Sequence, residues 1–166
     1  IVSRGVLLDI PRNQGVDWLE PRAAITIEDL EAAEEAQGVR VTEGDILLVA
    51  TGRDVRRDRH GPWSPIEVGL AGLHPECVAW LRERDVAVLG GDGVHDVLPT
   101  SGIDQWPMPI HQCGLAAMGM HLLDNLRLDR LAEACARNER WSFQLTVAPL
   151  RVARGTGSPV NPIAVL

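Results

Sequence analysis

The segment from Pro109 to Leu126 holds the residues best suited to chemistry, because it places a histidine and a carboxylate beside an otherwise apolar helix. Imidazole and carboxylate groups are common metal ligands and proton carriers. His111 and Asp124 lie thirteen residues apart, so on one continuous helix, at about 100° per residue, they would point roughly 140° apart. If Gly119 ends the helix in the left-handed conformation and residues 120–123 run on extended, Asp124 returns to the start of the helix. We therefore expect these two side chains to form one site.

Both residues also have structural interpretations. His111 is as well explained by a helix cap or the core as by a metal ligand or general base. Asp124 taken alone is best explained as the N-cap of a helix that begins near Arg127. Cys113 lies two residues after His111, and a cysteine–histidine nucleophile pair is conceivable. Because two such side chains on a helix point to different sides, Cys113 is interpreted as a small core residue.

Asp92 is a second kind of candidate. It follows a buried apolar strand predicted at residues 86–89 and lies within the run Gly90-Gly91-Asp92-Gly93. Aspartate and glycine gather in tight turns for backbone reasons. Ligand sites in α/β proteins, however, lie where strands end. Asp92 is therefore a candidate site residue that shapes the wall of the site, with a plain turn as the alternative.

Composition excludes several classes of protein. The formal net charge of −7 over 166 residues argues against a nucleic-acid partner, which requires a basic face. The longest strongly apolar run, residues 113–120, is too short to span a membrane. The chain has no lysine and no tyrosine, which removes Schiff-base and phosphate-loop lysines and a tyrosine acid. Three scattered cysteines do not suggest a disulfide framework, so a cytoplasmic location is expected.

Strand and helix patterns alternate along the chain, which predicts an α/β fold in a single domain over residues 1–166. Apolar runs predict strands at residues 2–10, 45–50, 86–89, 141–150 and 160–166. Helices are predicted at residues 26–37, 74–85 and 126–138, the first with Thr26 as N-cap and Asp29 as the acid of a capping box. Residues 51–70 are predicted to form a polar loop, and the glycine-rich residues 155–159 a hairpin turn.

The ordered motifs of the chain resemble the cyclase family, which includes bacterial kynurenine formamidase and isatin hydrolase. The motifs that carry the resemblance are Gly44-Asp45-Ile46-Leu47-Leu48-Val49-Ala50-Thr51-Gly52, Gly72-Leu73-His74, Leu89-Gly90-Gly91-Asp92, Pro109-Ile110-His111, Leu122-Leu123-Asp124-Asn125-Leu126, Ala148-Pro149-Leu150 and Gly155-Thr156-Gly157-Ser158-Pro159-Val160-Asn161-Pro162-Ile163-Ala164. They extend over nearly the whole chain, and the last is the most specific.

The resemblance implies a swivelling β/β/α-type fold with a mixed sheet and packed helices. It also implies a metal-dependent hydrolase, in which zinc or manganese activates water for attack on an amide or lactam carbonyl. The family's active-site histidine and acid fall here on His111 and Asp124, where the formamidases carry glutamate instead of aspartate. His111 would then serve as metal ligand or general base, and Asp124 as ligand or as the group that orients His111.

The family's hallmark motif, His-x-Gly-Thr-His-x-Asp-x-Pro, has no match in the sequence, although it supplies most of the metal ligands. A divalent metal site needs at least three protein ligands, and His111 with Asp124 provides two. The chain also begins with Ile1 inside a predicted strand. We therefore expect the C-terminal part of a longer enzyme, inactive alone and covered by the missing part or by a homo-oligomer. The alternatives are a non-catalytic binding or scaffold protein and a hydrolase that uses Cys113.

Overall fold

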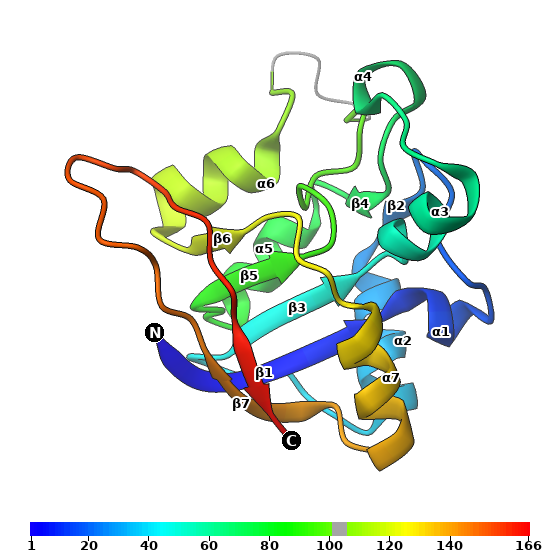
Figure 1. Cartoon of the computed structure of the whole chain (residues 1–166), viewed down its shortest axis with the longest axis horizontal. Coiled ribbons are helices and arrows are strands. Elements are labelled where there is room, and N and C mark those ends of the chain that lie inside the picture. Colours follow the sequence, from blue (N-terminus) through cyan, green and yellow to red (C-terminus); the bar gives the residue numbers. More distant parts are fainter. Residues whose placement is uncertain (101–105) are drawn as a thin grey trace.

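The computed structural model describes residues 1–100 and 106–166, in which a central sheet carries helices on both faces (Figure 1). The strands are β1 (Val2–Asp9), β2 (Ala24–Ile25), β3 (Ile46–Ala50), β4 (Gly72–Leu73), β5 (Val88–Gly91), β6 (His121–Leu123), β7 (Ser142–Thr146) and β8 (Ile163–Val165). The helices are α1 (Ile10–Gln14), α2 (Ile27–Gln37), α3 (Arg53–His60), α4 (Pro65–Val68), α5 (Cys77–Glu83), α6 (Pro109–His111), the π-helix η1 (Gln112–Met118) and α7 (Asp129–Asn138).

The main sheet is mixed. Within the described residues its strand order is β6-β5-β3-β1-β7-β8, and β2 pairs with β4 in a separate small sheet. Strands β6, β5, β3 and β1 run parallel to one another, whereas β7 is antiparallel to both β1 and β8. The predicted α/β class, with a mixed sheet and packed helices, is confirmed. Of the helices in the described part of the chain, none is long and apolar enough to cross a membrane.

Strand β1 lies between β3 and β7, and its side chains alternate between two apolar cores. Val6 and Leu8 pack on the face that α2 and α5 cover, while Leu7 packs on the face that α7 covers. All three side chains are fully buried. Parallel strands that are buried on both faces have nearly continuous apolar sequences. This explains why the runs at residues 2–10 and 45–50 predict these strands correctly.

Local signals set the ends of helix α2. The side chain of Thr26 accepts a hydrogen bond from the backbone N–H of Asp29, and the Asp29 carboxylate accepts one in return from the N–H of Thr26. This is the predicted capping box. Gly38 ends the helix in the left-handed conformation, which glycine adopts without steric cost. The helices predicted at residues 74–85 and 126–138 are also present, but shorter, as α5 and α7.

The prediction of a polar loop over residues 51–70 is wrong, because the structure forms α3 and α4 there. Helix α3 buries none of its residues, so its sequence lacks the apolar period that reveals a helix packed on a core. Its arginines instead lie over tryptophan rings: Arg56 is 4.6 Å from the Trp63 ring centroid and Arg59 is 4.9 Å from that of Trp18. Cation–π contacts therefore attach this helix to its neighbours.

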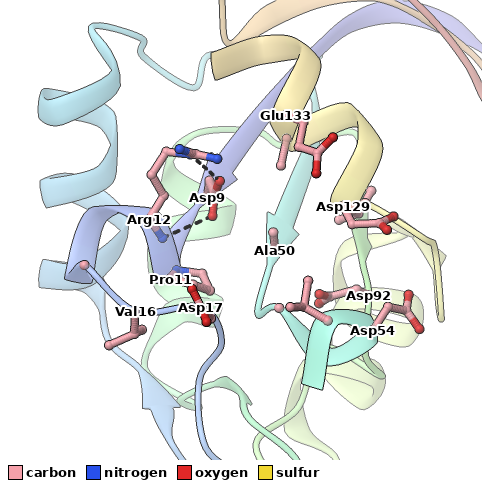
Figure 2. A pocket seen from close by; sticks show the side chains of 15 residues that line it. Asp9, Pro11, Arg12, Val16, Asp17, Ala50, Asp54, Asp92, Asp129 and Glu133 are labelled. Carbon is pink, nitrogen blue, oxygen red and sulfur yellow. Dashed lines mark hydrogen bonds and ion pairs between the residues drawn. The ribbon is translucent and has the colours of Figure 1, made fainter. Parts of the chain in front are cut away.

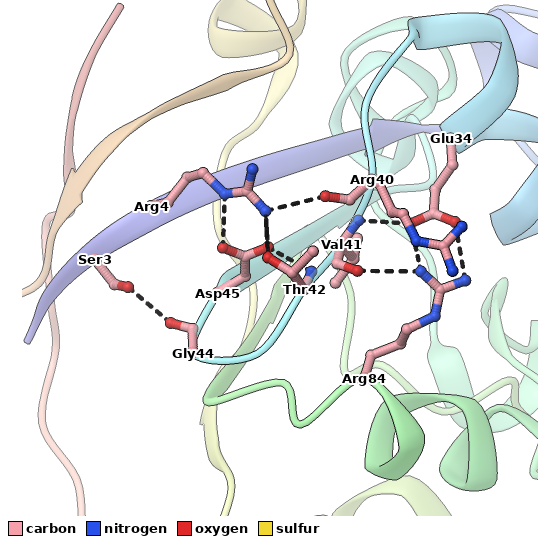
Figure 3. A network of polar contacts seen from close by, with 9 residues as sticks. All are labelled: Ser3, Arg4, Glu34, Arg40, Val41, Thr42, Gly44, Asp45 and Arg84. Carbon is pink, nitrogen blue, oxygen red and sulfur yellow. Dashed lines mark hydrogen bonds and ion pairs between the residues drawn. The ribbon is translucent and has the colours of Figure 1, made fainter.

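Two buried carboxylates join the strands and helices on the side of the sheet away from the carboxyl ends of the parallel strands (Figure 3). Asp45 accepts two hydrogen bonds from the guanidinium of Arg4, at 2.8 and 2.6 Å. Glu34 of α2 accepts two from Arg84, at 3.0 and 3.1 Å, and one from the N–H of Val41 at 2.6 Å. Charges taken out of water are tolerated when they are paired and hydrogen-bonded in this way.

We expect Arg84→Ala to lower the free energy of unfolding by about 3 kcal/mol, because it leaves the Glu34 carboxylate buried without its counter-ion. Urea denaturation followed by circular dichroism measures the change. Arg82→Ala is the matched control, since Arg82 pairs with Asp85 at the surface and its side chain is 68% exposed. An exposed pair contributes about 1 kcal/mol or less. Equal losses in the two variants would contradict the assigned role of Glu34.

Candidate functional site

The candidate site residues follow the carboxyl ends of two neighbouring parallel strands. Asp92 and Asp96 come after β5, and Asp124 comes directly after β6. His111 closes the short helix α6 on the connection between these strands. Polar groups that follow adjacent parallel strands meet at one edge of the sheet, where α/β proteins bind ligands. The fold therefore places these residues at the same edge of the sheet, although they are far apart in the sequence.

His111 and Asp124 converge in the way the sequence predicts. Gly119 ends the π-helix η1 with a φ of 66°, and its N–H donates to the carbonyl of Gly114. Strand β6 then carries the chain back, so that Nε2 of His111 lies 3.4 Å from Oδ2 of Asp124. The sequence did not indicate that the helix is a π-helix. Such helices are rare and occur frequently at functional sites.

Asp96 holds the start of α6 and the ring of His111. Its Oδ1 accepts the N–H of Ile110 at 2.7 Å, and its Oδ2 lies 2.7 Å from Nδ1 of His111. Helix α6 has no side-chain cap of its own, so this carboxylate satisfies a backbone donor that would otherwise lack a partner. Because Asp96 takes Nδ1, the other ring nitrogen of His111 faces Asp124.

A second imidazole contacts the other carboxylate oxygen of Asp124. Nε2 of His95 lies 3.0 Å from Oδ1 of Asp124. The contact is close enough for an ion pair, but it is not aligned as a hydrogen bond. The rings of His95 and His111 lie 5.9 Å apart, centroid to centroid. One carboxylate therefore lies between two histidines.

The charges of this group are coupled. Hydrogen bonds with Asp124 and Asp96 raise the pKa of His111 to about 9, since they stabilise the charged imidazolium. Burial disfavours the charged form of Asp124, but its contacts with His111 and His95 outweigh this and hold its pKa well below the usual range. A cation that bound to Nε2 of His111 would have to displace its proton, so binding would strengthen as pH rises.

Asp92 lies apart from this pair. Its carboxylate accepts hydrogen bonds from the N–H and the hydroxyl of Thr51, at 2.9 and 2.8 Å, and from the N–H of Arg53 at 3.1 Å. Burial raises its pKa, although these bonds oppose the shift. The guanidinium of Arg53 in turn donates to the Asp92 carbonyl and to the side chain of Asn125, next to Asp124. Asp92 thus fixes the start of α3, and Arg53 links this helix to Asn125, the residue after Asp124.

Figure 2 shows Asp92 in the wall of a cavity of about 420 Å³. Asp54 and Asp129 lie in the same wall, whereas His111 and Asp124 do not line this cavity. The structure therefore brings together His111 and Asp124 but not Asp92. Cys113 lies half-buried on η1, and within the described residues the ring of His111 hydrogen-bonds to Asp96 and Asp124, not to this thiol. Asp124 does not cap α7, whose N-cap is Leu128.

Sequence reasoning missed His95 and Asp96 as site residues. Both lie just after the Gly90-Gly91-Asp92-Gly93 run, in which the sequence points to Asp92 alone. The signal that could have found Asp96 is its place after a buried strand, combined with a helix at Pro109 that has no cap of its own. The signal for His95 is weaker, because its contact with Asp124 depends on an unusual backbone conformation.

The family model Cyclase, described as "Putative cyclase", matches residues 1–95, which is more than half of the chain. The chain belongs to the Cyclase family. The resemblance seen in the motifs is thereby confirmed, and the members of this family with known structures supply the comparison for the fold. No curated protein matches this cyclase-family chain.

Solved structures agree with this assignment. A crystal structure of a novel cyclase is 29% identical to the chain with a TM-score of 0.85, and the match covers 100% of this chain and 54% of that one. Isatin hydrolase A from Labrenzia aggregata, bound to benzyl benzoate, is 25% identical with a TM-score of 0.71 and coverages of 98% and 60%. A predicted metal-dependent hydrolase from Bacillus stearothermophilus, 16% identical with a TM-score of 0.64 and coverages of 98% and 63%, shares the fold. The chain thus spans between half and two thirds of the length of these relatives.

Replacing Asp124 should change the titration of His111. In metal-free protein we expect Asp124→Asn to lower the pKa of His111 from about 9 toward the ordinary value near 6.5, because the neutral amide no longer stabilises the imidazolium. NMR of the imidazole nitrogens against pH measures this pKa. Asp129→Asn is the control, since Asp129 pairs with Arg127 and should leave His111 unchanged. A pKa for His111 that is the same in both variants would contradict the geometry.

Proposed function

We propose that the chain forms part of a metal-dependent hydrolase that cleaves a carbon–nitrogen bond of a small amide or lactam. The observation that carries the proposal is the convergence of His111 and Asp124, with Asp96 behind the imidazole. Relatives of the same fold are named isatin hydrolase and metal-dependent hydrolase, which supports this class of reaction. We also propose that the substrate is an aryl formamide or a lactam. The proposed metal is zinc or manganese.

The donor atoms fit a divalent cation. Two ligands of one tetrahedral zinc, each at about 2.0–2.1 Å from the ion, are about 3.3 Å apart. Nε2 of His111 and Oδ2 of Asp124 are 3.4 Å apart. Nδ1 contacts Asp96, and metal-bound histidines nearly always have such a partner on their second ring nitrogen, either a carboxylate, a backbone carbonyl or water. His111 and Asp124 would therefore hold the ion from one side.

The proposed ion needs further ligands. Within residues 1–100 and 106–166 no group of three or more His, Cys, Asp or Glu side chains is arranged to hold a metal. The relatives contain considerably more polypeptide than this chain covers. We therefore propose that the remaining ligands lie on polypeptide outside these 166 residues, and that the chain alone does not turn over substrate.

Each side chain has a defined part in the proposed reaction. When bound, the cation supplies Lewis acidity and lowers the pKa of a water so that it can attack the carbonyl. His111 would bind the cation through Nε2 and keep its remaining proton on Nδ1, where Asp96 accepts it. Asp124 would bind the same cation through Oδ2 and balance part of its positive charge. Asp92 contributes to the wall of the site indirectly, because it anchors the start of α3 and hence Arg53.

Activity and metal content of the complete gene product test the proposal. We expect hydrolysis of an aryl formamide, a lactam or a lactone, abolished by a chelator and restored by zinc or manganese. His111→Ala should lower kcat/KM by about 100-fold or more and reduce the bound metal measured by mass spectrometry. His121→Ala, which removes an exposed histidine from β6, is the control and should retain both properties.

Three outcomes would count against this function. Unchanged turnover in His111→Ala would remove that residue from the reaction. Absence of both metal and turnover in the complete gene product would favour a binding or scaffold protein that keeps the fold. Inactivation by a thiol reagent that a chelator does not reproduce would favour a reaction at Cys113.

A further inference from the structure

His95 is a buried polar side chain that has no part in the proposed reaction. Only 1% of its side chain is exposed, and its Nε2 makes no hydrogen bond within the described residues. A buried polar atom without a hydrogen bond is destabilising, and such atoms are uncommon in folded proteins. This Nε2 lies 3.0 Å from Oδ1 of Asp124, which is the contact that can explain it. An imidazole that is kept here despite this cost points to a role at the site.

The backbone around His95 is also unfavourable. Its φ of 63° lies in the left-handed region, which residues other than glycine adopt uncommonly because of steric strain. The conformation is held by a hydrogen bond of 2.6 Å from the N–H of Leu73 to the His95 carbonyl. Gly72 makes this close approach possible, since a Cβ there would lie 2.5 Å from the same carbonyl oxygen. The neighbouring strand β4 is therefore shaped to keep His95 in this conformation.

A second glycine leaves room for the ring. A Cβ at position 91 would lie 3.2 Å from Nδ1 of His95, closer than side chains usually approach. The left-handed turn has a further effect, because successive side chains of an extended chain point to opposite sides. Here the adjacent residues His95 and Asp96 reach the same pair: Asp96 contacts His111, and His95 contacts Asp124. The turn thus aims two consecutive side chains at one site.

The role of His95 follows from what it touches. Its ring is too buried to meet a substrate, so it can act only through Asp124 and His111. A carboxylate next to a β-strand can rotate about its side-chain bonds, and a contact on Oδ1 restricts that rotation. With Oδ1 placed against His95, Oδ2 is the oxygen that faces Nε2 of His111.

We infer that His95 is a positioning residue that fixes the carboxylate of Asp124, so that Oδ2 of Asp124 and Nε2 of His111 face the same divalent cation. The inference rests on the proposed metal function, because a cation is what the positioned atoms would bind. The contact between His95 and Asp124, however, is a feature of this chain alone. Asp96 positions the histidine of the pair, and His95 positions the acid.

Two substitutions at His95 in the complete gene product separate positioning from packing. Asparagine tolerates the left-handed conformation better than histidine, but its amide is too short to reach Asp124. Glutamine is long enough to place an amide nitrogen where Nε2 lies. With Co²⁺ as the probe, we expect His95→Asn to weaken binding about 10- to 100-fold and to change the visible absorption of the bound ion. His95→Gln should recover most of the affinity.

The thermal midpoint of the metal-free proteins provides a readout of structure. We expect His95→Asn to unfold at the same temperature as the wild type or higher, because it relieves backbone strain. A lower midpoint together with unchanged Co²⁺ affinity and spectrum would overturn the inference, since it would show that His95 only packs. Equal Co²⁺ affinity in His95→Asn and wild type would overturn it as well.

Crystal structures of the metal-free wild type and His95→Asn distinguish this inference from the proposed function. We expect Oδ2 of Asp124 to face Nε2 of His111 in the wild type and to turn away in the variant. If the wild type fails to bind Co²⁺, the metal function falls, while these structures still decide whether His95 positions Asp124. An unmoved Asp124 in the variant would refute the positioning role whatever the metal result.

Discussion

The buried carboxylate of Asp96 is the interaction on which the candidate site depends. It accepts the N–H of Ile110 and contacts Nδ1 of His111, so that a single charge fixes both the start of α6 and the tautomer of the imidazole. The charge is almost fully removed from water, which makes each of these contacts stronger than it would be at the surface. Because the ring is fixed, its Nε2 has a defined position, and Asp124 on β6's carboxyl end can approach it.

The fold does not depend on the site in the same way. Both faces of the sheet are covered by apolar cores that this chain builds by itself, one under α2 and α5 and the other under α7. The polar groups of the site lie beyond the carboxyl ends of β5 and β6, outside those cores. This separation allows strained and poorly paired residues such as His95 to persist, because the cores supply the stability that such residues lack.

The strands and the convergence of His111 with Asp124 could be predicted because local residue types encode them. Continuous apolar runs indicated β1 and β3, and a glycine at position 119 indicated the end of the helix. Helix α3 could not be predicted, since it buries no side chain and therefore has no apolar period. The contacts of Asp96 could not be predicted, because its partners lie fourteen and fifteen residues further along the chain. The contact of His95 with Asp124 could not be predicted, because a histidine in the sequence does not by itself indicate the positive φ that this contact requires.

The two ion pairs that link strands and helices at the amino ends of the parallel strands both use arginine, and the sequence contains no lysine. A guanidinium keeps its charge to about pH 12 or above, whereas a lysine ammonium loses it near pH 10.4. The pairs of Arg4 with Asp45 and of Arg84 with Glu34 therefore stay intact in strongly basic solution. The links between α2, α5 and the sheet are thus insensitive to alkali, which a lysine in the same places would not have allowed.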